Sequence, residues 1–139
     1  MNQNNELTQY MYQVEQYKEQ ISQLEYQSQY LQAAAMDYNK AKITLKNLEK
    51  ADKKIDMLLP LGGGTYINAN SENTKKVLVD IGSGFVTEKT YKDAIIKIDE
   101  RIQKLEKSQE KVNEMINQIQ SEAEKISAKA QKLMENEKQ

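Results

Sequence analysis

The sequence contains no cysteine, no histidine and no tryptophan, and it has only one proline and one phenylalanine in 139 residues. Without cysteine there can be neither a disulfide framework nor a thiol nucleophile, which is compatible with a reducing compartment. Without histidine, the chain lacks the commonest general base and the commonest metal ligand. We therefore expect no enzyme active site, no cofactor and no metal site.

Apolar residues are also scarce, at 38% of the chain against 29% charged residues. A compact core normally needs more, whereas a coiled-coil seam needs only about two apolar positions in seven. No apolar run approaches the roughly 18 residues that cross a bilayer, and "MNQNNELTQY" does not resemble a signal peptide. The net charge of -1 lacks the basic excess that nucleic acid binding needs. We expect an elongated, cytoplasmic protein that binds neither membranes nor nucleic acid.

Two long stretches repeat apolar residues in steps of three and four, the pattern of a coiled-coil seam. After Tyr38 the first pattern continues only if the register slips by a three-residue step, a local overwinding of the coil. The first set is Leu7, Tyr10, Val14, Tyr17, Ile21, Leu24, Ser28, Leu31, Ala35 and Tyr38, and then Ala41, Leu45, Leu48, Ile55 and Leu59. The second set is Tyr91, Ile95, Ile98, Ile102, Leu105, Gln109, Val112, Ile116, Ile119, Ala123, Ile126, Ala130 and Leu133. These patterns predict two long helices.

The segment between the helices changes character. "MLLPL", "TYINAN", "KVLVDI" and "FVTEK" are four short strand candidates, separated by "GGG", "SENT" and "GSG". They predict two hairpins, and Thr87 or Thr90 could cap the helix that follows. A triple glycine can also cradle phosphate, but here no Lys-Ser or Lys-Thr follows it, which favours a turn.

We therefore predict a mainly α, α+β fold with one domain over residues 1–139. Its parts are a coiled-coil helix over 1–56, two β-hairpins over 57–88, a second coiled-coil helix over 89–135 and a tail over 136–139. Helices of similar length joined by a short insert are expected to fold back as an antiparallel pair, with both termini at the free tip.

Small hairpins are marginal alone and leave unpaired backbone groups at their edges, so we interpret the insert as an assembly device. Val77, Val79 and Ile81 share one face of the third strand. The predicted assembly platform is Leu59, Leu61, Tyr66, Ile67, Val77, Val79, Ile81, Phe85 and Val86.

The order of helix, two glycine-turned hairpins and helix resembles the alpha-type subunit of archaeal prefoldin over nearly the whole chain. The specific part is "PLGGGTY", from Pro60 to Tyr66, together with "VLVDIGSGFVTEKT", from Val77 to Thr90. The resemblance implies a hexamer of two alpha-type and four beta-type subunits whose hairpins form β-barrels. It also implies an ATP-independent holdase that captures unfolded client proteins and delivers them to a group II chaperonin.

Client binding is expected at the tip, where frayed helix ends expose apolar side chains and where methionine adapts to many partners. The predicted client-binding residues are Leu7, Tyr10, Met11, Tyr12, Val14, Ile126, Ala130, Leu133 and Met134. Those on the seam could equally be simple packing residues. The alternative function is a structural coiled-coil scaffold or oligomerisation protein without chaperone activity, and an enzyme comes a distant third.

Overall fold

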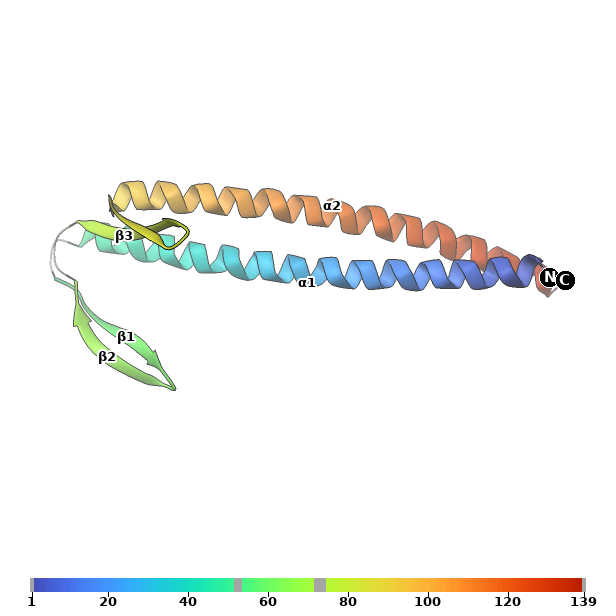
Figure 1. Cartoon of the computed structure of the whole chain (residues 1–139), viewed down its shortest axis with the longest axis horizontal. Coiled ribbons are helices and arrows are strands. Elements are labelled where there is room, and N and C mark those ends of the chain that lie inside the picture. The colour runs from blue at the N-terminus through green and yellow to red at the C-terminus, as the bar shows by residue number, and fades with distance from the viewer. Residues whose placement is uncertain (1, 52–53, 72–74, 139) are drawn as a thin grey trace. The chain divides into compact units, whose positions relative to one another are not determined.

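The computed structural model describes residues 2–51, 54–71 and 75–138. Along the chain, the elements are α1 (Asn2–Lys50), β1 (Asp56–Gly62), β2 (Thr65–Asn70), β3 (Lys76–Gly82), β4 (Phe85–Thr90) and α2 (Tyr91–Glu137). The strands form two separate two-stranded antiparallel sheets, β1–β2 and β3–β4 (Figure 1). The predicted mainly α class with two hairpins is confirmed.

The chain divides into two compact units, one formed by residues 1–35 with 105–139 and one by residues 36–104. In the first unit, α1 and α2 run antiparallel, so both ends of the chain lie at the same end of this unit (Figure 1). We call that end the tip. The second unit contains the two hairpins and the remaining part of each helix, residues 36–50 of α1 and 91–104 of α2.

The α2 seam follows the predicted heptads along its whole length. Each of its predicted seam residues is buried or half-buried, and Ile102, Val112 and Ala130 are among the buried ones. One polar layer interrupts the apolar seam in the first unit, where the Gln109 Nε2 donates to Ser28 Oγ at 2.6 Å and to Asn113 Oδ1 at 3.1 Å. The Gln109 Oε1 is buried and has no hydrogen-bond partner among the described residues.

This orphaned oxygen predicts that Gln109→Leu combined with Ser28→Ala stabilises the coiled coil. The double variant removes the desolvation cost of Oε1 and also removes the Ser28 hydroxyl that would otherwise lose its partner, so we expect the free energy of unfolding to rise by about 1 kcal/mol. Chemical denaturation monitored by circular dichroism measures the change. Gln118→Leu, an exposed position on the same helix, is the control and should have no such effect. A lower stability for the Ser28/Gln109 double variant would contradict the prediction.

The three-residue step that was predicted directly after Tyr38 falls later, between Leu45 and Leu48, which are both half-buried. Ala41 is exposed, and the half-buried position is Lys42, four residues after Tyr38, which continues the heptad. The Lys42 ammonium lies 2.5 Å from the Asp99 carboxylate of α2. Because its charge is paired, the lysine can lay its aliphatic stem along the seam.

The first helix ends at Lys50, six residues before the predicted end at residue 56. The seam position that follows Leu48 falls on a polar residue, Asp52, so further turns of helix would gain no apolar packing. Ile55 instead exchanges hydrogen bonds with Ser71: its carbonyl accepts from the Ser71 N–H at 2.9 Å, and its N–H donates to Ser71 Oγ at 3.2 Å. These bonds close the base of the first hairpin, which therefore includes Asp56.

The second helix begins at Tyr91 and continues to Glu137, so it starts and ends two residues later than predicted. Of the two possible caps, Thr90 is the one used, because its hydroxyl accepts a hydrogen bond from the Asp93 N–H at 3.2 Å. This contact satisfies one of the unpaired N–H groups of the first turn. Asp93 adds a carboxylate that interacts favourably with the helix dipole.

The two hairpins are geometric copies of each other. Adding 20 to both residue numbers of any β1–β2 pair gives a β3–β4 pair. For example, Asp56↔Asn70 in the first hairpin corresponds to Lys76↔Thr90 in the second. Both have a register shift just before the turn, at Leu61 and at Ile81. Gly63 and Gly64 adopt φ values of 57° and 74°, which suit the twist of a tight hairpin and explain the triple glycine as a turn.

Candidate assembly and client-binding surfaces

The first hairpin carries apolar side chains on both faces. Leu59 lies opposite Ile67 on one face, and Pro60 lies opposite Tyr66 on the other. The exposed fractions are 46% for Leu59, 51% for Ile67 and 61% for Tyr66. A two-stranded hairpin has no interior in which to bury these groups. The surface is therefore built for contact with other chain segments.

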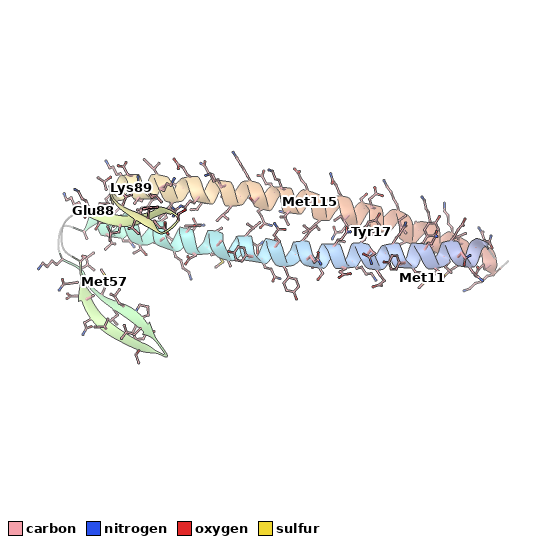
Figure 2. All side chains as sticks on the ribbon, viewed as in Figure 1. Met11, Tyr17, Met57, Glu88, Lys89 and Met115 are labelled. Atoms are coloured by element: carbon pink, nitrogen blue, oxygen red, sulfur yellow. The ribbon has the colours of Figure 1, made fainter. Side chains whose placement is uncertain are left out.

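The second hairpin packs one face on the helices of its own unit. Val77 and Val79 line a cavity of about 510 Å³ together with Tyr38 of α1 and Ile98 of α2, and Val79 is buried. The other face is open, because Leu78 is 71% exposed and Val86 57% exposed. Figure 2 labels two successive residues of β4, Glu88 and Lys89. Glu88 pairs with Leu78 of the open face, and Lys89 pairs with Val77 of the packed face.

The structure thus separates the predicted platform residues into two groups. Val77 and Val79 face the chain's own helices, while the other predicted residues remain exposed: Leu59, Leu61, Tyr66, Ile67, Ile81, Phe85 and Val86. The sequence reasoning missed Leu58 and Leu78, which are 62% and 71% exposed. Their position next to the predicted face was the available signal, because alternate residues of a strand point to opposite faces.

Arg101 of α2 links the second hairpin to the helices. This residue was not predicted from the sequence. Its guanidinium donates a hydrogen bond to the Asp80 carbonyl of β3 and lies 5.9 Å from the centre of the Tyr38 ring of α1. Arg101 is the single arginine among 20 basic residues. A planar guanidinium can donate at its edge while its face lies over an aromatic ring, which a lysine ammonium cannot do.

At the tip, the predicted client-binding residues also fall into two groups. Ala130 is buried in the seam, and five others are half-buried there: Leu7, Tyr10, Val14, Ile126 and Leu133. Met11, Tyr12 and Met134 are instead exposed by 60%, 66% and 46%. Figure 2 shows Met11 in the part of α1 near the tip. Apolar side chains are therefore accessible at the tip without fraying of the helices.

The family model for prefoldin subunits matches residues 17–136. The chain belongs to the prefoldin family. Two prefoldin alpha subunits are similar to it: that of Archaeoglobus fulgidus is 41% identical over 65% of this chain and 66% of its own length, and that of Methanococcus aeolicus is 31% identical over 76% of this chain and 71% of its own. The matches thus span about two thirds of the length of these relatives, and they assign the chain to the alpha-type prefoldin subunits.

The prefoldin fold is also seen in a solved structure. This chain superimposes on a chain of the cryo-EM structure of filamentous PFD from Methanocaldococcus jannaschii with a TM-score of 0.59 and 23% sequence identity. The superposition covers 91% of this chain and 98% of the solved chain. At that identity the similarity concerns the fold. Prefoldins are non-enzymatic chaperones that form oligomeric complexes with other prefoldin subunits.

The described residues also bear on the membrane and metal alternatives. Neither of this prefoldin's helices is long and apolar enough to span a membrane. Within the described ranges, no group of three or more Asp or Glu side chains is placed to hold a metal ion. The apolar surfaces of the hairpins and of the tip are therefore the candidate functional sites.

Proposed function

We propose that this alpha-type prefoldin subunit is an ATP-independent holdase that binds unfolded polypeptides at the tip of its coiled coil and transfers them to a group II chaperonin. The observation that carries the proposal is the exposure of Met11, Tyr12 and Met134 beside well-packed seam residues. Met and Tyr side chains adapt to varied apolar partners, as binding to many different clients requires. The absence of a phosphate-binding motif supports independence from ATP.

The working form in this proposal is a cytoplasmic hexamer of two alpha-type and four beta-type subunits. The exposed apolar faces of both hairpins support it, because burying them requires neighbouring chains. One tip offers only partial burial of a few side chains, so its binding is weak. Six tips on one platform raise the effective concentration of binding sites, which gives capture with easy release.

A triple variant, in which Met11, Tyr12 and Met134 are each replaced by glutamine, tests whether the tip binds clients. In a hexamer reconstituted with a beta-type subunit, we expect the alpha-subunit contribution to aggregation suppression of a denatured protein to fall severalfold without ATP, because the apolar contact area is lost. Light scattering during refolding measures the effect. Glutamine is a good helix former, so α1 and α2 should persist.

The matched control is Met36→Gln with Met115→Gln, which removes two methionines that are 62% and 48% exposed elsewhere on the same helices. This control should suppress aggregation like the unmodified complex. If the tip variant also does so, the tip hypothesis is wrong. A stable homo-oligomer that suppresses no aggregation would instead favour the scaffold function.

A further inference from the structure

The side of α1 turned away from the seam carries three tyrosines that neither assembly nor seam packing uses. Tyr12, Tyr26 and Tyr30 are 66%, 72% and 75% exposed, and all three belong to the first unit. Single exposed tyrosines are ordinary on protein surfaces. What distinguishes these three is their common direction and their acidic neighbours.

Helix geometry places the three rings in one line. Tyr12 and Tyr30 are separated by about five full turns at 3.6 residues per turn, and Tyr26 lies one turn before Tyr30. The rings are thus spaced by about 21 Å and about 6 Å along the helix. The seam residues of the same segment, such as Ile21 and Leu24, are half-buried on the opposite side.

The same side of the helix is acidic. Residues 1–35 contain four glutamates and one lysine, a net charge of -3. Glu15 and Glu19 are exposed and lie between Tyr12 and Tyr26 on their side of the helix. The lysine, Lys18, lies 3.6 Å from Glu15, but both side chains are mostly exposed and such a pair is easily replaced. We call Tyr12, Glu15, Glu19, Tyr26 and Tyr30 the outer strip.

A strip of aromatic rings and carboxylates attracts arginine and lysine and repels acidic segments. A guanidinium over a tyrosine ring gains from the ring quadrupole, and a carboxylate within one turn, as Glu15 is from Tyr12, adds a charge-assisted hydrogen bond. An extended polypeptide advances about 3.3 Å per residue, so the ring spacings correspond to about six and about two residues. Both numbers are even, so side chains at these spacings point to the same face of an extended strand.

We propose that the outer strip binds basic, extended segments of unfolded polypeptides, with arginines at a first position and six and eight residues later. The inference rests on the proposed holdase function, and it adds a class of client: unfolded proteins rich in arginine and lysine. Tyr12 belongs to both the outer strip and the tip, so a bound segment can continue from one surface to the other along the same helix.

The experiment uses the complete hexamer and three fluorescent peptides of equal length in a Gly/Ser background. One peptide has arginines at the predicted spacing, one has glutamates at the same positions, and one has the same arginines moved to odd spacings. Binding is measured by anisotropy at low and high salt. The variants are Tyr26→Gln with Tyr30→Gln, Glu15→Gln with Glu19→Gln, and a tip control, Met11→Gln with Met134→Gln.

We expect the hexamer to prefer the correctly spaced arginine peptide over the other two. Removing Tyr26 and Tyr30 should weaken binding of that peptide about fivefold, because two cation–π contacts are lost. Removing the two carboxylates should weaken it and flatten its salt dependence. The tip control should leave the arginine peptide bound while reducing aggregation suppression, which separates this inference from the proposed function.

Equal binding of arginine and glutamate peptides, or unchanged affinity after loss of Tyr26 and Tyr30, would overturn the proposal. A change in subunit number in the Tyr26/Tyr30 variant would also overturn it, because the strip would then be covered by a neighbouring chain. Circular dichroism establishes that each variant keeps its helix content. If the tyrosine variant fails to fold, the carboxylate variant still decides the outcome, since it leaves the rings in place.

Discussion

Leu59→Lys combined with Ile67→Glu is expected to dissociate the prefoldin complex while the subunit itself stays folded. The two residues lie directly opposite each other in the β1–β2 register, so the new side chains form a cross-strand ion pair that keeps the hairpin intact. When the platform assembles, however, this charged pair must lose its water at the position where two apolar side chains were buried before. Such a replacement costs about 3 kcal/mol, or a factor on the order of 100 in association.

Native mass measurement and sedimentation test this prediction. The matched control is Asp56→Lys with Asn70→Glu, which places the same charges in the same hairpin at a pair that contains no apolar side chain. We expect the control to assemble with a beta-type subunit and the Leu59/Ile67 variant to remain unassembled. If both assemble equally well, this face of the first hairpin lies outside the interface.

Arg101→Ala should release the second hairpin from the helices. The substitution removes the hydrogen bond to the Asp80 carbonyl and the contact with the Tyr38 ring. Loss of a charged hydrogen bond and of the cation–π contact lowers the local stability of β3–β4 by about 2 kcal/mol, which corresponds to about 30-fold faster amide exchange. Hydrogen exchange of residues 76–90 measures the effect directly.

Two controls make the Arg101 prediction specific. Arg101→Lys keeps the charge but loses the planar fork, so we expect most of the loss to remain. Lys104→Ala removes an exposed basic residue one turn further along α2 and should leave the exchange of the hairpin unchanged. Unchanged exchange in Arg101→Ala would show that apolar packing around Val79 alone holds the hairpin.

Local patterns explain which features could be predicted without a structure. The α2 seam was predictable because its heptads are unbroken from Tyr91 to Leu133, and a helix with such a stripe must bury it. The hairpins were predictable because residues with positive φ are needed at tight turns, and "GGG" and "GSG" supply them. Both signals are carried by residues that are near each other in sequence.

The mispredicted features depend on partners that are distant in sequence. Lys42 occupies a seam position with its charge paired to Asp99, and the two residues are far apart in the chain. Likewise, the end of α1 at Lys50 reflects the bonds that Ile55 makes with Ser71 on the far side of the first hairpin. Periodicity alone favoured the apolar Ala41 and a longer helix, since it contains no information about these partners.

The sequence by itself determined the two helices, the two hairpins and their turns, and through the hairpin sequences it indicated the prefoldin family. Only the tertiary structure decided which apolar residues remain available for partners. It turns Val77 and Val79 toward the chain's own helices and leaves Leu78 and Val86 open, and it makes Arg101 the joint between β3 and both helices. The physical reason is that alternation along a strand defines two faces, but which face is buried depends on what packs against it.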